Sequence, residues 1–314
     1  MYPLLSICIP TLSDVSSLKN NLDILFNENS SLIEINVCDD CPTQEILEIV
    51  EKYQSKLTIN YFRGKSEGLD SALIKLIECS SGEYIWWIGD DLLLPGSLKK
   101  ICQILSLRNN LIFLWVNSHS IDDDKLTFGT IDDIFFDDRD LLLKHDIGLL
   151  GFITATIFRR EESLVGMNEA KTHIGSSFTC LFIILNILSL KGQLGMIGDS
   201  CFKSREKPSG EVRWYDQFQV FGINLYDIVN EFDNVFTFRN RRKALANNLV
   251  KVLKATLVER AMGFNTGFAS KTVTTKSLFS RYYSFPQFWI FLPLIFTPTS
   301  LISIVYKVYS FIKK

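Results

Sequence analysis

Several patterns that would identify common enzyme classes are missing from this chain of 314 residues. No GxGxxG segment follows the first predicted strand, which disfavours a dinucleotide-binding oxidoreductase. The segment RGKS at 63–66 is not a phosphate-binding P-loop, because that motif needs a glycine five residues before Gly64 and Ile59 stands there. Histidine is scarce, and the spacing of the three that occur forms no set of metal ligands: His119, His145 and His173.

Cysteine is present without the pairing that a zinc site or a disulfide framework requires. The seven cysteines are dispersed, and Cys38 and Cys41 form a CxxC that no second pair accompanies. Cys38 closes a predicted strand instead of opening a helix, which disfavours a thioredoxin-like redox role. The N-terminal segment has neither a basic region nor a small-residue cleavage site, so no signal peptide is predicted. We therefore expect reduced thiols in a cytosolic compartment.

Negative charge is almost absent from the last quarter of the chain. From Arg239 to Lys314 the sequence holds 13 Lys or Arg and one acid, Glu259, which leaves 20 basic and 34 acidic residues in the rest. A strongly basic part of this kind is typical of a region that meets an anionic surface. Nucleic acid and anionic lipid are the two candidate partners.

The uncharged run at residues 282–306 favours lipid, so no nucleic acid partner is expected. A run of this length could span a bilayer core of about 30 Å, but prolines at 286, 293 and 298 would break or kink a helix. We therefore expect short, broken helices that lie in the membrane interface, with aromatic side chains at headgroup depth and lysines on lipid phosphates. A membrane-spanning helix is the second interpretation, and a buried helical hairpin of a soluble protein is the third.

Apolar runs alternate with helical patterns over roughly the first 120 residues. Strands are predicted at 4–10, 33–40, 56–62, 83–88, 111–117, 150–158 and 193–200, and helices at 16–26, 43–53, 68–79, 96–107, 178–190 and 240–260. The alternation predicts βαβ units, and hence an α/β fold with a mostly parallel, buried sheet flanked by helices. We expect one domain over 1–238 and a basic helical region over 239–314.

The predicted strands end in polar residues suited to a nucleotide diphosphate and its metal ion. In open sheets of this type, ligands bind at the carboxyl ends of the strands. Those ends carry the candidate binding residues Pro10, Thr11, Asp39, Asp40, Arg63, Asp90 and Asp91. A carboxylate after the second strand can accept the N3–H of a pyrimidine base or cap the following helix, and the cap is favoured for this pair considered alone.

Asp90 and Asp91 are candidate metal ligands. Two like charges side by side repel each other, and a cation between them removes the repulsion. Mg²⁺ and Mn²⁺ prefer carboxylate oxygens together with substrate phosphates, so we expect one Asp to bind the metal and its neighbour to act through water or the ribose. A solvated turn before Pro95 is an alternative of nearly equal weight on spacing alone.

Four segments in the first third of the chain resemble the motifs of family 2 glycosyltransferases, which have the GT-A fold. That family typically shows a first strand ending in IPTYN, a second strand reading VVDDGSTD, an arginine with an NxG turn, and a fourth strand reading GEYIxFLDxDDxxxPGxL. The matching segments are SICIPTLSD (6–14), NVCDDCPTQ (36–44), FRGKSEG (62–68) and GEYIWWIGDDLLLPGSL (82–98). Two later segments are similar to bacterial surface-polysaccharide transferases of an abequosyltransferase-like subgroup: GFITATIFRREE (151–162) and HIGSSFTCLFIIL (173–185).

This resemblance implies an enzyme that transfers a hexosyl or deoxyhexosyl group with inversion from a UDP-, dTDP-, CDP- or GDP-linked sugar. The nucleotide base would lie near Pro10–Thr11 and Asp39, and Arg63 would hold the diphosphate together with Mg²⁺ or Mn²⁺. The implied acceptor is a polyprenyl-diphosphate-linked glycan of O-antigen or other surface-polysaccharide synthesis. The implied place is the cytoplasmic face of the bacterial inner membrane.

The chain departs from the family pattern at three points. Gly89 stands where an aspartate is common, and Ser66 replaces the asparagine of the turn. The acid pair that opens a later helix in the family has no direct match. Glu169 and His173 lie near the expected place and are the candidates for the catalytic base.

Two other functions belong to different classes. One is a catalytically inactive relative that binds nucleotide-sugars or acts as a scaffold, which the missing acid pair favours. Calorimetry with nucleotide-sugars followed by a transfer assay separates binding from turnover. The other is a nucleotidyltransferase, which needs a glycine-rich basic loop after the first strand, and the segment PTLSDVSSLK (10–19) lacks one.

Overall fold

The computed structural model describes residues 2–12, 14–28, 30–121, 125–127, 129, 131–144, 146–204, 218–261 and 275–312, so His145 lies outside the described residues. The chain divides into two compact units. The first combines Met1–Arg139 with Leu149–Lys207 and contains the sheet, and the second combines Asp140–Gly148 with Pro208–Lys314 and is helical where it is described. The expected domain boundary at residue 238 stays a prediction.

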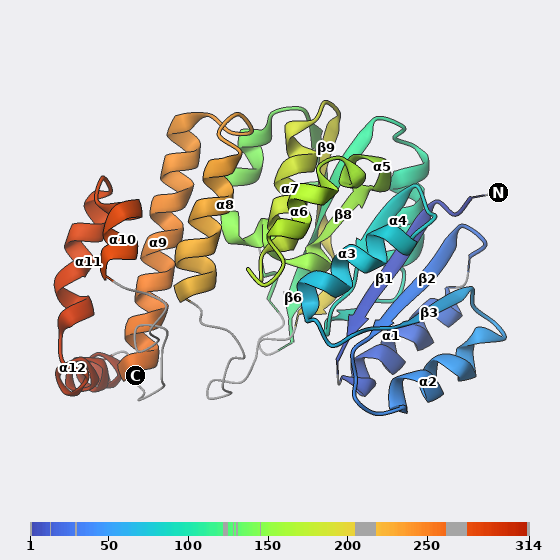
Figure 1. The fold of residues 1–314 in the computed structure, drawn as a ribbon, viewed down its shortest axis with the longest axis horizontal. Helices are drawn as coiled ribbons and strands as arrows, with labels where there is room; N and C mark the ends of the chain where they lie inside the picture. The colour runs from blue at the N-terminus through green and yellow to red at the C-terminus, as the bar shows by residue number, and fades with distance from the viewer. Residues whose placement is uncertain are drawn as a thin grey trace. The chain divides into compact units, whose positions relative to one another are not determined.

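A mixed sheet forms the centre of the first unit (Figure 1). Within the described residues the strands lie in the order β3 (Ile59–Arg63), β2 (Ile33–Asp39), β1 (Leu5–Thr11), β4 (Tyr84–Trp87), β8 (Thr156–Arg159), β6 (Leu111–Ser120), β9 (Gln193–Ser204) and β5 (Leu92–Leu93), and β7 (Ile134–Phe136) also pairs with β9. The first four strands in this order are parallel, as predicted. Strands β6 and β9 also pair in parallel. For the remaining pairs the prediction of a mostly parallel sheet is wrong: β8 is antiparallel to β4 and β6, and β5 and β7 are antiparallel to β9.

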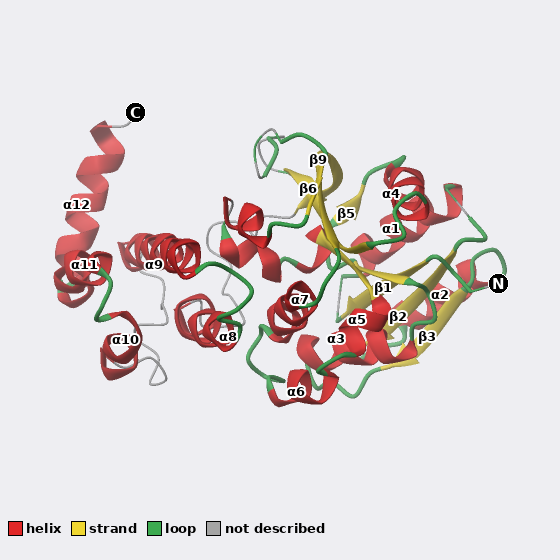
Figure 2. Cartoon of the chain, turned by 90° about the horizontal axis from the view of Figure 1, so that it is seen from above, coloured by secondary structure: helices red, strands yellow, loops and turns green. Residues whose placement is uncertain are grey.

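Helices cover both faces of this sheet. Helices α1 (Val15–Asn27) and α4 (Ser97–Ser106) lie on one side, and α3 (Leu69–Cys79), α5 (Arg160–Leu164), α6 (Met167–Thr172) and α7 (Thr179–Ser189) lie on the other (Figure 2). Helix α2 (Glu45–Gln54) packs against α1 and β3. The strand predicted at 150–158 is wrong in its first part, which contains the short 3₁₀ helices η2 (Ile147–Gly151) and η3 (Ile153–Ala155). An antiparallel strand needs no crossover helix, so these short turns suffice to lead into β8.

The central strands are buried on both faces. In β1 and β4, side chains that point to opposite sides of the sheet are fully buried, among them Ile7, Cys8, Trp86 and Trp87. Each such apolar side chain contributes about 1.5–3 kcal/mol through its burial. Helices cover both faces, so the central strand β4 is an apolar run, Tyr84–Trp87, that is buried on both sides.

A buried carboxylate ties together the amino ends of three strands. Glu34 Oε1 accepts hydrogen bonds from Ser6 Oγ and Ser81 N, both at 2.6 Å, and Glu34 Oε2 accepts from Ser81 Oγ at 2.7 Å. Burial alone would raise the pKa of Glu34, but the donors of Ser6 and Ser81 hold it below the ordinary value of 4.5. The ionised form is therefore part of the folded structure.

We expect Glu34→Gln to lower the free energy of unfolding at pH 7 by about 1.5–3 kcal/mol, because the amide loses the charge that its donors stabilise. A carboxyl whose pKa is depressed by folding stabilises the protein above its unfolded pKa, and this contribution is lost as the pH falls through its folded pKa. Urea unfolding at pH 7 and below pH 4 measures both effects. A difference between wild type and Glu34→Gln that stays constant with pH would contradict the assignment.

The described part of the second unit consists of helices. They are the 3₁₀ helix η1 (Arg139–Lys144), the start of η2, the π-helix η4 (Phe218–Asn224), α8 (Leu225–Glu231), α9 (Phe238–Ala261), α10 (Thr275–Tyr282), α11 (Pro286–Phe296) and α12 (Thr299–Ile312). The predicted short, broken helices are present: Pro286 opens α11, Pro298 directly precedes α12, and Pro293 lies inside α11. Among the described helices, none is long and apolar enough to cross a membrane.

Candidate functional site

The first four strands bring their polar carboxyl ends to one edge of the sheet. Thr11 of β1 lies opposite Asp39 of β2, and Asp39 lies opposite Arg63 of β3. On the other side of β1, Cys8 is paired with Trp87 of β4. Asp90 follows Trp87 by three residues, as Thr11 follows Cys8, so the Asp90–Asp91 pair comes directly after the adjacent strand. The residues predicted from the strand ends therefore belong to one edge.

Asp39 is fully buried, and both of its carboxylate oxygens accept hydrogen bonds from the chain itself. Asp39 Oδ1 accepts from Cys41 N at 2.7 Å, which fixes the turn after β2. Asp39 Oδ2 accepts from Tyr61 Oη at 2.5 Å and from Arg63 Nη1 at 2.7 Å. Burial and the bond to Asp39 raise the pKa of Tyr61, so its hydroxyl stays protonated and donates. This geometry favours Asp39 as the residue that orients Arg63, whose side chain is 43% exposed.

Asp40 points toward the segment that follows β3. Its Oδ1 accepts a hydrogen bond from Ser66 N at 3.0 Å. A Cβ on Gly64 would lie 1.8 Å from the same oxygen, so a larger residue at this position would displace the Asp40 carboxylate. Asp40 and Arg63 line a cavity of about 380 Å³ whose wall also carries Lys65, Lys75 and Lys171. Glu67 and Glu78 also line it, so the carboxylate lies beside a concave surface of mixed charge.

The role of Asp39 can be tested by a double-mutant cycle on nucleotide binding. We expect Asp39→Asn to weaken binding of UDP or another accepted nucleotide by about tenfold, because Arg63 loses a charge-assisted partner. In an Arg63→Ala background the same substitution should cause little further loss, since interacting residues are not additive. Calorimetric dissociation constants of the four proteins measure this. Additive losses would mean that Asp39 contacts the nucleotide independently of Arg63.

Asp90 and Asp91 have different environments. Asp90 is exposed, whereas Asp91 is only 4% exposed. The described residues contain no group of three or more His, Cys, Asp or Glu that could hold a metal by themselves. Mg²⁺ and Mn²⁺ usually take one or two protein carboxylates and complete their coordination with phosphate oxygens and water. Two adjacent carboxylates, one accessible, therefore fit a cation that arrives with a diphosphate.

The thiol beside this site is unsuited to metal binding or redox chemistry. Burial, followed by the charges of Asp40 and Asp39, raises the pKa of Cys38 to about 11. A thiol with this pKa stays protonated at neutral pH, and thiolates are the reactive and metal-binding form. The interpretation of Cys38 as an ordinary thiol is in keeping with this, and that of Cys41 stays a prediction.

The two candidates for the catalytic base lie on α6 and its end. Glu169 is exposed in the first turn of α6. His173 is half-buried at the C-cap, and its ring stacks on Phe182 with a centroid distance of 4.4 Å. Their catalytic role stays a prediction.

A buried carboxylate that the sequence analysis missed holds the loop after His173. Asp70 Oδ2 accepts hydrogen bonds from Gly175 N and Ser177 N, both at 2.9 Å. Burial raises the pKa of Asp70, while the two backbone donors act in the opposite direction. Tyr61 was also missed, although its place two residues before Arg63 puts both side chains on the same side of β3.

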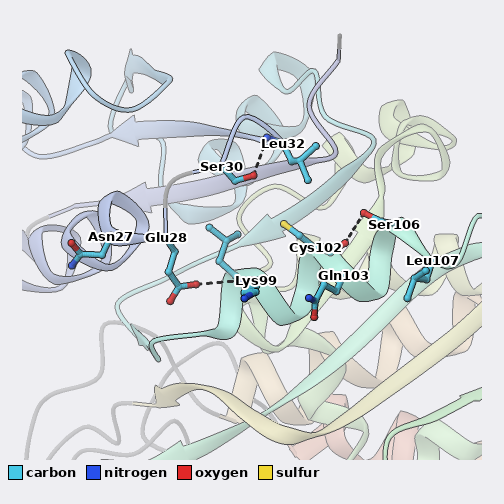
Figure 3. Close-up of a pocket in the computed structure, with 10 residues that line it drawn as sticks. Asn27, Glu28, Ser30, Leu32, Lys99, Cys102, Gln103, Ser106 and Leu107 are labelled. Carbon is cyan, nitrogen blue, oxygen red and sulfur yellow. Dashed lines mark hydrogen bonds between the residues drawn. The ribbon is translucent and has the colours of Figure 1, made fainter.

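A second hollow of about 790 Å³ lies between the end of α1 and helix α4 (Figure 3). Its lining consists mainly of apolar and small polar side chains, including Leu32, Leu98 and Cys102, and it contains none of the predicted site residues. Glu28 bridges its two sides, since its carboxylate accepts hydrogen bonds from Gly96 N and Lys99 N. The Glu28 carboxylate is thus engaged by backbone donors, and the strand edge, which carries the predicted residues, remains the candidate site.

The fold and this edge define an α/β protein whose strand ends suit a nucleotide diphosphate. A family model described as glycosyl transferase family 2 matches residues 6–162, half of the chain. The chain therefore belongs to glycosyl transferase family 2. It is also 28% identical over 120 residues to an uncharacterized glycosyltransferase of Rickettsia bellii (strain RML369-C), an alignment that covers 38% of this chain and 17% of that protein.

Solved structures of S. aureus TarS have a similar fold. TarS 1–349 in complex with UDP-GlcNAc has a TM-score of 0.62 at 15% identity, and the match covers 88% of this chain and 79% of that one. The complex with UDP has a TM-score of 0.57 at 16% identity, with coverages of 87% and 76%. The longer TarS structure matches with a TM-score of 0.57 at 14% identity, over 87% of this chain and 46% of that one. At these identities the likeness establishes the fold, and the expected GT-A-like architecture is confirmed.

Proposed function

We propose that this protein is an inverting glycosyltransferase that moves a sugar from a nucleotide-sugar donor to a lipid-linked glycan. The observation that carries the proposal is the row of Thr11, Asp39 and Arg63 beside the Asp90–Asp91 pair, at the carboxyl edge of four parallel strands. Ligands of open α/β sheets bind at this edge. An arginine and adjacent carboxylates are suited to a diphosphate and its cation.

Each residue of the edge has a distinct role in the proposed reaction. The nucleotide base lies near Pro10–Thr11, and Arg63, oriented by Asp39, binds the diphosphate. As the bond between the anomeric carbon and the phosphate oxygen breaks, negative charge grows on the leaving diphosphate. Mg²⁺ or Mn²⁺ held by Asp90 and Asp91 would stabilise that charge. Stabilisation of this kind is stronger in the transition state than in the ground state, which is the condition for catalysis.

Inversion also needs a base on the face of the sugar opposite the leaving group. This base accepts the proton of the acceptor hydroxyl as the new glycosidic bond forms, and contributes about 10²–10⁴-fold in rate. Glu169 and His173 are the candidates. The structural likeness to TarS, solved with UDP and with UDP-GlcNAc, supports a nucleotide-sugar as the donor class.

The acceptor is proposed to be a polyprenyl-diphosphate-linked glycan at the cytoplasmic face of the bacterial inner membrane. Helices α10 to α12 support this location, because they expose a set of large apolar side chains, here called the exposed apolar set: Phe279, Tyr283, Trp289, Ile290, Leu294, Leu301 and Ile304. Three aromatic members are in contact, with Phe279 5.8 Å from Tyr283 and 5.9 Å from Trp289 between ring centroids. Aromatic side chains within a basic region suit the interface of an anionic bilayer.

We further propose a role in the synthesis of O-antigen or another surface polysaccharide. The support is the similarity of residues 151–162 and 173–185 to abequosyltransferase-like enzymes, which use nucleotide-activated deoxysugars. This proposal sets the order in which donors are tested, with dTDP- and CDP-linked deoxysugars beside UDP- and GDP-linked sugars.

Thermal stabilisation by nucleotide-sugars in the presence of Mn²⁺ tests the donor class. A ligand at 100 times its dissociation constant stabilises the folded state by about 2.7 kcal/mol, so the accepted donor should stand out. The same donor is then incubated with membranes that contain lipid-linked glycans, and transfer of the sugar is measured. Binding without transfer favours the inactive relative, and no stabilisation by any donor contradicts the proposal.

A further inference from the structure

The turn that carries Asp91 is held by a buried amide of helix α1. Asn21 Nδ2 donates to Asp91 O at 2.8 Å, and Asn21 Oδ1 accepts from Leu93 N at 2.9 Å. Asn21 is fully buried. The Asn21 side chain therefore satisfies the hydrogen-bonding groups of the backbone on both sides of Leu92, and fixes the path of the chain from β4 into β5.

A buried hydroxyl holds the other side of the same turn. Gly89 N donates to Thr154 Oγ1 at 3.1 Å, and the carbonyl oxygen of Thr154 accepts from Trp86 Nε1 at 2.9 Å. Thr154 is fully buried in η3. A Cβ on Gly89 would lie 3.4 Å from Ile153 Cδ1 and 3.6 Å from Thr154 Oγ1, so η3 packs directly against the end of the strand.

These bonds are placed at the two ends of the acidic pair. Thr154 holds the residue before Asp90, and Asn21 holds the carbonyl of Asp91. All four bonds of Asn21 and Thr154 described above join a side chain to the backbone of another segment and belong to no helix or strand ladder. Fixing the backbone on both sides reduces the conformational freedom of two carboxylates that would otherwise repel each other. A site held in its productive geometry binds a charged ligand more tightly, because less conformational entropy is lost on binding.

We propose that Asn21 and Thr154 are positioning residues that hold the Asp90–Asp91 turn in the conformation that receives the cation of the donor diphosphate. This inference rests on the proposed function. Asn21 and Thr154 act only through the backbone of the turn and touch neither the donor nor the cation.

The test compares Thr154→Val, which removes the accepting oxygen at nearly constant size, with Thr154→Ser, which keeps it. We expect Thr154→Val to raise the dissociation constant for Mn²⁺, measured by electron paramagnetic resonance in the presence of UDP, by about 3- to 10-fold. Thr154→Ser should recover the wild-type value. UDP binding in EDTA should be unchanged, because the turn contributes through the cation. The nucleotide identified by the donor screen replaces UDP if UDP does not bind.

Asn21→Leu provides the second variant, and it should weaken Mn²⁺ binding more than Thr154→Val because it removes two bonds. The inference is overturned if Thr154→Val binds Mn²⁺ as tightly as the wild type. It is also overturned if this variant loses the same UDP affinity with and without Mn²⁺. Both outcomes can be measured even if Asn21→Leu fails to fold. A wild-type protein that shows no Mn²⁺-dependent binding of any nucleotide overturns the metal role in the proposed function, and this inference with it. The two failures are therefore distinguishable.

Discussion

Replacement of Asp91 by asparagine is expected to lower donor hydrolysis and sugar transfer by on the order of 10²–10³-fold or more. Asparagine keeps the size of a side chain that is almost fully buried, but it removes the negative charge that a hard cation prefers. The loss should appear in kcat at saturating donor, because the cation acts on charge that develops in the transition state. Release of nucleoside diphosphate in the presence of Mn²⁺ measures it.

The matched control for this prediction is Asp132→Asn, which removes one negative charge from an exposed position in the same unit. This control should keep the wild-type rate, and both variants should unfold at the wild-type temperature. EDTA should bring the wild type down to the rate of Asp91→Asn. Undiminished turnover by Asp91→Asn in Mn²⁺ would remove the metal role from this pair.

The parallel half of the sheet could be predicted from the sequence, because the local order of apolar runs and helical patterns there matches the order of strands and helices in the fold. Each of its strands is a short apolar run, and a helical pattern lies between it and the next. Polar residues stand where each run stops, so Thr11, Asp39 and Arg63 could be assigned to one edge before their register was known. Parallel pairing then brings them opposite one another.

The mixed half of the sheet could not be predicted, because it depends on pairings between segments that are distant in sequence. Strand β8 lies between β4 and β6, and only the long-range pairing decides its direction. The two-residue strand β5 is too short to produce a periodic pattern. Asp91 could be assigned to the strand end, but the contact of Asn21 with the backbone of this turn could not be predicted.

The contacts that orient the site could be predicted only in part from the sequence. Asn21 lies on the buried stripe of α1 beside Leu18 and Leu22, and a polar residue at such a position indicates a specific partner. The sequence could not name the partner, because it lies about 70 residues away in β5 and the preceding turn. The role of Asp39 was open for the same reason: only the folded structure brings Tyr61 and Arg63 to one of its oxygens.

The double variant Trp289→Asp, Ile290→Asp is expected to weaken binding to anionic vesicles by at least about 10²-fold. Trp289 is 50% exposed and Ile290 is 68% exposed, so the substitutions remove apolar area that would enter the bilayer interface. Full burial of side chains of this kind contributes about 1.5–3 kcal/mol each, and about 1.4 kcal/mol corresponds to a tenfold change. Each new aspartate is also repelled by the anionic surface. Co-sedimentation with vesicles that contain phosphatidylglycerol measures the change.

Substitution is a sharper test here than deletion of residues 282–314. The deletion would remove Tyr282, Phe285 and Phe288, which are buried in the second unit, so a truncated protein could lose membrane binding simply by unfolding. The control is Leu107→Asp, which introduces one such negative charge at an exposed leucine of the first unit. It should bind vesicles like the wild type. Equal vesicle binding by the double variant and this control would show that the exposed apolar set does not contact the bilayer. Weaker binding of the wild type and both variants in high salt would reveal the contribution of the basic residues.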